Sequence, residues 1–242
     1  MIRRRVHLPP ERIGPARAEL TEEARHYLRD VLRLPPGTAV ELFDGQGAVF
    51  EATIEPGFAA LAVGARREAA VAGPALSLLF ALSKGEKGEL VVQKATELGV
   101  ARLCPWAAER SVLKLDEQKG RERAERWRRI AEEAARQCGR ADVPEVTAPL
   151  GLAAVLAAVP AGHRLVVLHG PGGAPLATLG LEEVAGVALV VGPEGGLTDG
   201  ELSACEAAGA VRGSLGPRTL RAETAAIAGV AVLQAVAGDL GR

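Results

Sequence analysis

Four apolar runs in the last two thirds of the chain limit its fold more than any other feature. LSLLFALS (76–83) is a continuous apolar run, and RLVVLHG (164–170), VALVVGPEGG (187–196) and VRGSLG (211–216) each end in glycine. Continuous apolar runs are typical of strands buried on both faces. Helical patterns follow several of these runs, so we predict an α/β domain with a mostly parallel sheet and helices on both faces.

Two segments between the first and second runs show helical periodicity. The segment 86–98 stops before Gly99, which is placed to cap a helix. Small and apolar residues recur at heptad spacing in the segment 121–138, namely Ala124, Trp127, Ala131, Ala134 and Cys138. Arg and Glu occupy most of its other positions, which predicts a long amphipathic helix with one buried face.

The first 72 residues have a different pattern. TAVELFDGQGAVFEATIE (38–55) holds two alternating runs joined by DGQG, which predicts a β-hairpin. A short helix is predicted at Thr21–Leu32, with Thr21 as its N-cap. Short strands of this kind favour a small β-barrel. We therefore predict two domains, 1–72 and 73–242.

The composition excludes several classes of protein. The chain has 242 residues, of which 48% are hydrophobic, so it can bury a sizeable core. No run of about 18 apolar residues occurs, and no apolar segment follows the basic start MIRRRVHLPPER, so we expect a cytoplasmic protein without a membrane span. The three cysteines are far apart and fit neither a disulfide framework nor a zinc site. We expect them to be buried small hydrophobic residues, and we expect no metal.

The net charge of −1 is unevenly distributed. Residues 1–72 carry ten basic and ten acidic side chains, residues 73–140 fourteen and ten, and residues 141–242 five and ten. A protein that binds phosphates needs only a local basic face, which the middle segment could supply. The alternative is a solvated surface of ion-paired helices.

Four basic residues of the middle segment could reach phosphates. Lys87 and Lys94 share one side of the predicted helix 86–98, where their stems could equally cover apolar surface. Arg136 and Arg140 flank the end of the helix 121–138, where cations also stabilise the helix dipole. Both interpretations stay open from the sequence alone.

Three of the predicted strands end in loops that are rich in glycine and proline. These loops are LHGPGG (168–173), GPEGG (192–196) and LGPRTLR (215–221). Parallel strands place their carboxyl ends at one edge of the sheet, where ligands bind. Glycine lets a backbone approach a ligand closely, and proline stiffens the loop. One such loop would be an ordinary connection, but three at one edge predict a shared pocket.

The same loops restrict the ligand. None matches the phosphate fingerprints GxxxxGK[ST] or GxGxxG, which a nucleotide-dependent oxidoreductase or an ATPase would need. Glu194 lies in the middle loop, and little positive charge accompanies it. Backbone amides and a carboxylate suit an uncharged aromatic group and a cationic centre better than a polyphosphate. They point toward something like S-adenosylmethionine, although residue types alone do not identify it.

The charged residues around these loops have structural alternatives. Thr198 and Glu201 match a capping box, which explains them as the start of a helix but does not explain Glu194. Arg221 precedes the last helix, where a cation is unfavourable, so it needs a partner. An ion pair with Glu223 or Glu194 is the simplest partner. His169 could be a ligand contact or a packing residue.

Four stretches together resemble one family. KGEKGELVVQKATELGV, AARQCGRADVPEV, LVVGPEGGLTDGEL and SLGPRTLRAETAAIAGVAVLQ are similar, in this order, to the ribosomal small subunit methyltransferase E family of the SPOUT class. The match runs from about residue 76 to the end, and the N-terminal part resembles that family's small PUA-like β-barrel. The resemblance implies a homodimer with a deep trefoil knot. It also implies S-adenosylmethionine-dependent methylation of N3 of one uridine in 16S rRNA, within an assembled small subunit.

The resemblance further implies that the three loops are knot loops that hold the cofactor. The implied cofactor-binding residues are Leu168, His169, Gly170, Val191, Gly192, Pro193, Glu194, Gly195, Leu215, Gly216 and Leu220. The barrel would face RNA, which fits the basic cluster at the N-terminus. The RNA-binding candidates are Arg3, Arg4, Arg5, Lys87, Lys94, Arg136 and Arg140.

Methylation of uridine N3 gives three residues hypothetical catalytic roles. Arg221 could stabilise the developing uridine anion through O2 or O4. Glu223 or Glu194 could accept the N3 proton or orient Arg221, and the sequence does not choose between these carboxylates. Two other functions would share much of this pattern: a SPOUT enzyme that acts on tRNA, and a non-enzymatic RNA-binding assembly factor.

Overall fold

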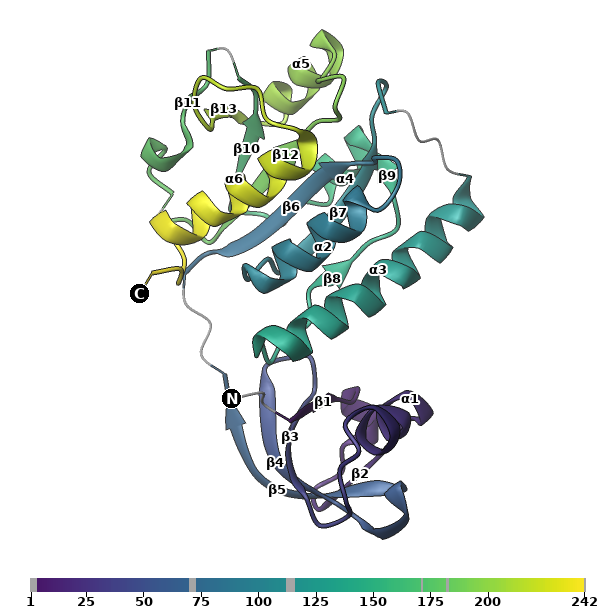
Figure 1. The fold of residues 1–242 in the computed structure, drawn as a ribbon. Helices are drawn as coiled ribbons and strands as arrows, with labels where there is room; N and C mark the ends of the chain where they lie inside the picture. The colour runs from purple at the N-terminus through teal and green to yellow at the C-terminus, as the bar shows by residue number, and fades with distance from the viewer. Residues whose placement is uncertain (1–3, 70–72, 112–115, 171, 182, 242) are drawn as a thin grey trace. The chain divides into compact units, whose positions relative to one another are not determined.

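The computed structural model describes residues 4–69, 73–111, 116–170, 172–181 and 183–241. The chain forms two compact units (Figure 1): a first unit of Met1–Val71 with Glu132–Val143, and a second unit of Ala72–Ala131 with Pro144–Arg242. The sequence predicted a single domain boundary between residues 72 and 73, but Glu132–Val143 packs with the N-terminal segment. The reason is packing, because Ala135 and Ala141 share a small core with Phe43 and Val49.

The first unit is a curled five-stranded sheet in the order β1-β3-β4-β5-β2. Its strands are β1 (Arg5–His7), β2 (Arg17–Glu19), β3 (Ala39–Phe43), β4 (Ala48–Ile54) and β5 (Ala60–Glu68). The predicted hairpin is confirmed, since β3 and β4 pair antiparallel across the DGQG turn. Two of its turn amides donate to one carboxylate oxygen of Asp44, at 2.8 Å from Gln46 and 3.0 Å from Ala48.

The predicted helix near Thr21 is also confirmed, but only its first half is α-helical. Helix α1 (Glu22–His26) begins at Thr21, whose hydroxyl accepts the Ala24 amide at 3.1 Å. A π-helical turn, η2 (Tyr27–Val31), continues it, with the Leu32 amide 2.9 Å from the Tyr27 carbonyl. Short 3-10 turns also occur at η1 (Pro10–Arg12) and η3 (Pro56–Phe58).

The second unit is an α/β fold on an eight-stranded sheet, ordered β11-β13-β10-β12-β6-β7-β8 with β9 beside β7. All described strand pairs of this sheet are parallel, as predicted. Its strands are β6 (Ala75–Ala81), β7 (Arg102–Ala107), β8 (Glu145–Val146), β9 (Leu150–Gly151), β10 (His163–Leu168), β11 (Ala174–Pro175), β12 (Gly186–Val191) and β13 (Val211–Ser214).

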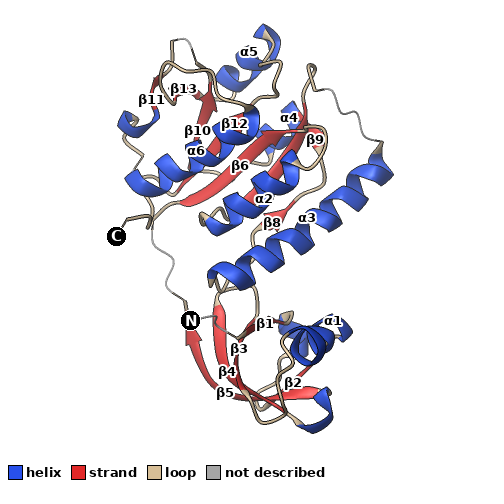
Figure 2. Cartoon of the chain, viewed as in Figure 1, coloured by secondary structure: helices blue, strands red, loops and turns tan. Residues whose placement is uncertain are grey.

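Helices cover both faces of this sheet (Figure 2). The helices are α2 (Lys87–Glu97), α3 (Glu117–Cys138), α4 (Leu152–Ala157), α5 (Asp199–Ala207) and α6 (Ala222–Val236), with a 3-10 turn η4 (Leu176–Thr178). On one face, α4 and α5 bury Val155 and Leu202 against strand residues such as Val190. On the other, α2 and α6 pack together, and α6 contacts β6 and β12. Strand residues alternate between these two cores.

Helix α3 has the predicted amphipathic face, with one correction. Ala124, Trp127, Ala131 and Ala134 are buried, but Cys138 is exposed. Cys138 is the last residue of the helix, and Ala135 takes the buried position there. Cys104 and Cys205 are buried as expected, and burial raises the pKa of the Cys205 thiol to about 11.

Candidate functional site

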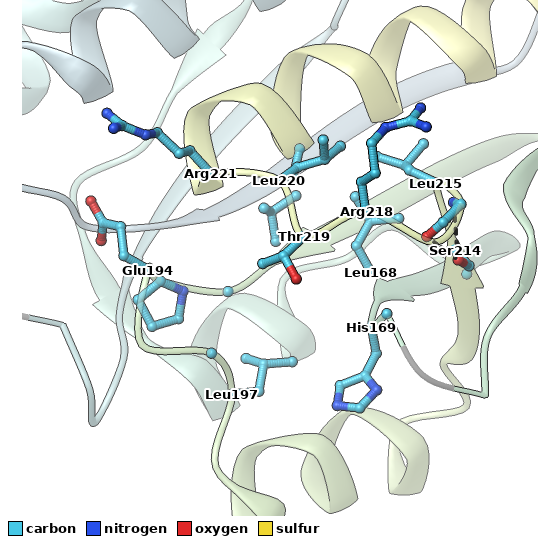
Figure 3. Close-up of a pocket in the computed structure, with 18 of the residues that line it drawn as sticks. Leu168, His169, Glu194, Leu197, Ser214, Leu215, Arg218, Thr219, Leu220 and Arg221 are labelled. Carbon is cyan, nitrogen blue, oxygen red and sulfur yellow. Dashed lines mark hydrogen bonds between the residues drawn. The ribbon is translucent and has the colours of Figure 1, made fainter.

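Three loops leave the carboxyl ends of the neighbouring strands β10, β12 and β13 and enclose one cavity (Figure 3). The cavity has a volume of about 640 Å³. Small-molecule sites commonly fall between about 300 and 1,000 Å³. The shared pocket predicted from the three glycine-rich loops is therefore present at the predicted edge.

The implied cofactor residues gather there with one exception. Leu168, His169, Gly170, Val191, Gly192, Pro193, Glu194, Leu215, Gly216 and Leu220 all line the cavity. Gly195 is not among the lining residues; its Cα faces Arg110 instead, since a Cβ there would lie 3.2 Å from Arg110 Cβ. Pro171 of the first loop lies outside the described residues.

The candidate residues named from the sequence omit eight residues of the lining, namely Gly196, Leu197, Gly213, Ser214, Pro217, Arg218, Thr219 and Ala225. Most of them flank or lie within the glycine loops, so their position in the loop is the signal that could have found them. Ala225 lies one turn into α6, and only the closeness of α6 to the sheet brings it to the cavity.

The lining is mostly apolar side chain and backbone. Leu168, Leu197, Leu215 and Leu220 project around the cavity in Figure 3. The backbone of Gly216 has φ +108°, a value that L residues rarely adopt. A Cβ on Gly213 would lie 2.9 Å from Val166 Cγ1, so the strand can pack there only without a side chain. The two glycines shape the loop that separates β13 from α6.

Two arginines and one glutamate supply the charges of the lining: Arg218, Arg221 and Glu194. Arg221 is the N-cap residue of α6, as its position before the last helix predicted. Figure 3 shows Arg221 and Glu194 at one end of the cavity and His169 toward the other. Within the described residues no ion pair joins Arg221 to Glu194 or Glu223, so the expected ion pair is not formed.

Lys87, rather than Arg221, is the cation that pairs with Glu194 and Glu223. Its Nζ lies 2.7 Å from Glu194 Oε1 and 3.8 Å from Glu223 Oε2. The hydrogen bond from Lys87 holds the pKa of the Glu194 carboxyl below its usual range, and the same bond raises the pKa of Lys87. In the part of the chain that the structure describes, Glu223 Oε2 is buried and has no hydrogen-bond partner.

The helix start after the middle loop is structural, as predicted. The Glu201 amide donates to the Thr198 hydroxyl at 3.2 Å, and the Thr198 amide donates to Glu201 Oε2 at 2.8 Å. Glu201 is 5% exposed, and its Oε1 accepts the Glu109 amide at 2.8 Å. Arg110 donates to the carbonyls of Gly195 and Leu197 at 3.1 and 3.3 Å. The segment after β7 thereby fixes the outer side of the middle loop.

The predicted RNA-binding residues divide into different environments. Arg3 lies outside the described residues, and Arg4 is exposed. Arg5 is 1% exposed, so the prediction that it contacts RNA is wrong. It bonds Glu41, donates to the carbonyls of Ala135 and Arg140 at 3.3 and 2.8 Å, and stacks 4.6 Å from the centre of the Phe43 ring.

The other four RNA-binding candidates have intramolecular partners. Lys87 is bound to Glu194, and Lys94 to Glu97 at 2.9 Å. Arg136 lies 3.7 Å from the centre of the Tyr27 ring and pairs with Glu133, and Arg140 pairs with Asp142. Burial lowers the pKa of Arg136. These four remain candidates, but an RNA phosphate would have to share or displace the partner already present.

No group of three or more His, Cys, Asp or Glu side chains among the described residues is placed to hold a metal ion. Likewise, no helix within that part of the chain is long and apolar enough to cross a membrane.

Comparison with protein families matches both units. The RNA methyltransferase domain matches residues 72–234, and the RNA methyltransferase PUA domain matches residues 20–57. A ribosomal RNA small subunit methyltransferase E from Synechocystis sp. is 36% identical over 96% of this chain and 77% of its own length. A protein of the same name from Mycobacterium tuberculosis is 35% identical over 81% of this chain and 78% of its own.

Two solved structures are similar over almost the whole chain. A putative methyltransferase from Legionella pneumophila, in complex with the cofactor SAM, is 34% identical with a TM-score of 0.90 and covers 99% of this chain and 100% of its own. A ribosomal RNA small subunit methyltransferase E from Neisseria gonorrhoeae, bound to S-adenosyl methionine, is 28% identical with a TM-score of 0.88. It covers 98% of this chain and 99% of its own.

Proposed function

Because the chain belongs to the ribosomal RNA small subunit methyltransferase E family, we propose that it methylates N3 of a specific uridine in 16S rRNA. It is an rRNA methyltransferase that uses S-adenosylmethionine. The observation that carries the proposal is the cavity at the carboxyl edge of β10, β12 and β13, which three glycine loops enclose.

The lining of this cavity fits S-adenosylmethionine. Leucine side chains such as Leu168 and Leu220 offer apolar surface to a purine, and the glycine loops leave backbone amides and carbonyls accessible to its edge. Glu194 provides negative charge near a cationic centre, and the loops lack the fingerprints of a polyphosphate site. When bound, S-adenosylmethionine supplies an electrophilic methyl group on its positively charged sulfur.

The remaining chemistry falls to the charged residues at one end of the cavity. The uridine must be unpaired or flipped to expose N3. Arg221 donates to O2 or O4 of the base and stabilises the negative charge that develops when N3 loses its proton. Glu223 or Glu194 accepts that proton or orients Arg221. Alignment of the base against the methyl donor lowers the activation free energy by up to about 7–11 kcal/mol.

Several finer features belong to the same proposal. The first unit binds RNA, which the match to the RNA methyltransferase PUA domain supports. The substrate is 16S rRNA within the small ribosomal subunit, the enzyme works as a homodimer with a knotted cofactor site, and it acts in the cytoplasm. Light scattering of the purified protein measures its mass against the 25.1 kDa of one chain, and a monomer would contradict the homodimer.

Primer extension tests the reaction and its substrate together. Unmodified small subunits are incubated with the protein and S-adenosylmethionine, and the 16S rRNA is then copied by reverse transcriptase. A methyl group on N3 removes the Watson–Crick donor, so we expect a new stop at one uridine that requires both protein and cofactor. A stop on free tRNA but none on small subunits would move the substrate to tRNA.

Calorimetry with S-adenosylmethionine separates the enzyme from a non-enzymatic assembly factor. We expect saturable binding with one cofactor per cavity. A protein that binds small subunits but shows no heat with the cofactor would be an assembly factor.

A further inference from the structure

Lys87 bridges two acids from different elements, Glu194 in the cavity lining and Glu223, which is not among the lining residues. Its Nζ donates a 2.7 Å hydrogen bond to Glu194, in the loop after β12, and lies 3.8 Å from Glu223, in the first turn of α6. Lys87 itself is the first residue of α2. One ammonium group therefore connects the wall of the cofactor pocket with the start of the helix that Arg221 caps.

The position of Lys87 in its own helix is unfavourable, which requires an explanation. The N-terminal end of a helix carries partial positive charge, so cations are stabilising at the other end. The side chain of Lys87 is 35% exposed and could extend into solvent, away from the helix end. It instead points to Glu194 and Glu223, so these two carboxylates account for its placement.

We propose that Lys87 is a positioning residue for methyl transfer, which fixes Glu194 relative to Glu223 where the target base must lie. This inference rests on the proposed function, because it assigns a role within that reaction. Lys87 acts through the two carboxylates and is not expected to touch the cofactor or the rRNA. Its role thus differs from the phosphate contact that the sequence suggested.

The bridge also distinguishes the two candidate proton acceptors. The hydrogen bond from Lys87 occupies one oxygen of Glu194 and lowers the pKa of that carboxyl, which makes Glu194 a poorer proton acceptor. Glu223 has a buried oxygen that accepts no hydrogen bond from the described residues. The orienting role therefore belongs to Glu194, which lines the cavity and accepts the hydrogen bond from Lys87.

Three variants test the role of Lys87. Lys87→Met removes the ammonium and keeps an unbranched stem, Lys87→Arg keeps the charge, and Arg126→Met is the matched control. Arg126 of α3 pairs at 2.9 Å with Glu89 of α2, the helix that carries Lys87, and neither Arg126 nor Glu89 lines the cavity. We expect Lys87→Met to lower kcat about tenfold to a hundredfold, the size expected of a small misplacement of reacting groups. Lys87→Arg should recover most of that loss, and Arg126→Met should behave as wild type.

A double-mutant cycle identifies the partner through which Lys87 acts. If Lys87 works through Glu194, Lys87→Met should add little to the defect of Glu194→Gln, because interacting residues are not additive. Additive defects would overturn the inference. A rise in KM for the rRNA with unchanged kcat would also overturn it, since that result is expected of a phosphate contact.

Titration of the Glu194 carboxyl gives a readout that does not depend on activity. Glu194 faces Lys87, with Glu223 and Arg221 nearby and the Arg110 guanidinium on the far side of its loop. Its pKa is depressed by Lys87, so carbon-13 NMR should show this pKa rise in Lys87→Met and stay low in Arg126→Met. In the same variant the acid limb of the kcat profile should move to higher pH. Cofactor affinity should stay within about twofold of wild type.

The two proposals fail in different ways. If wild-type protein produces no primer-extension stop on any RNA, the proposed function is wrong. If wild type methylates and Lys87→Met equals it, only the role of Lys87 is wrong. An unchanged Glu194 pKa in Lys87→Met overturns the bridge whatever the activity.

Discussion

In the first unit, one arginine of the N-terminal basic cluster, Arg5, lies inside the structure, whereas in the second unit the arginines Arg218 and Arg221 line a cavity. Arg5 is buried and its donors reach Glu41 and two backbone carbonyls. Arg221 caps α6 at the cavity and has no ion pair with the neighbouring acids among the described residues. Both arginines lie near acidic residues, yet Arg5 forms hydrogen bonds within the protein and Arg221 forms no ion pair with the acids near it among the described residues.

This difference separates structural charges from functional ones. A buried guanidinium that bonds a carboxylate and two backbone carbonyls contributes to the fold and is not accessible to RNA. A guanidinium at the mouth of a cavity can donate to a ligand without first breaking a native bond. Mutations should therefore affect stability in the first region and turnover in the second.

Replacement of Arg5 should have the largest effect. Arg5→Met leaves the Ala135 and Arg140 carbonyls and one oxygen of Glu41 without their donor, so the free energy of unfolding should fall by about 3–5 kcal/mol. Urea unfolding followed by circular dichroism measures it. Arg4→Met, at the exposed neighbour, should change stability by no more than about 0.5 kcal/mol. A stable Arg5→Met with weakened RNA binding would restore the role that the sequence suggested.

The Arg5–Glu41 ion pair predicts how the stability of the first unit depends on acidic pH. Burial alone would raise the pKa of Glu41, but hydrogen bonds from Arg5 and Arg67 outweigh it and hold that pKa below its usual range. A carboxyl with a depressed folded pKa stabilises the protein above its unfolded pKa of about 4.3 and loses that contribution as the pH falls. Wild type should lose stability in this acidic window. Arg5→Met should show a smaller loss there, measured by urea unfolding as a function of pH.

Replacement of Arg221 should have the opposite outcome, a loss of turnover with little loss of stability. Arg221→Ala should lower kcat about 10²–10³-fold, because it removes a donor to charge that develops only during the reaction. Thermal stability and cofactor affinity should stay close to wild type, as measured by calorimetry. Arg212→Ala is the control, since Arg212 pairs with Glu206 outside the cavity lining. Lost cofactor binding in Arg221→Ala would place Arg221 among the cofactor contacts.

The sequence predicted the backbone of the site better than its charges. Apolar runs and glycine loops are local patterns, and the parallel sheet brings their ends together whatever the surrounding side chains do. The Lys87–Glu194 bond joins residues 107 positions apart, which no local pattern encodes. The burial of Arg5 likewise depends on the end of α3, which belongs to the first unit. Cys138 fits the heptad but falls on the last residue of its helix, where Ala135 is buried instead.

Gly216 tests whether the cavity depends on backbone conformation. Gly216→Ala meets no atom within 4 Å, but an L residue at φ +108° is strained by about 1–3 kcal/mol. The loop should relax away from its present course, so the dissociation constant for S-adenosylmethionine should rise about tenfold. Gly209→Ala, which also has a positive φ and open space but lies outside the cavity lining, should leave cofactor affinity unchanged. Equal losses of affinity in both variants would indicate a general effect on folding.

Thr198 should give the smallest effect, and it tests the division between structure and function within a single loop. Thr198 directly follows the lining residue Leu197, but it does not line the cavity itself and its hydroxyl accepts the Glu201 amide at 3.2 Å. Thr198→Ala should lower the free energy of unfolding by about 1 kcal/mol, the usual contribution of an N-cap. Cofactor affinity and kcat should not change, because Glu201 still fixes the Glu109 amide and Arg110 still holds the loop carbonyls. A loss of cofactor affinity without a loss of stability would show that the cap and the cofactor wall are one functional unit.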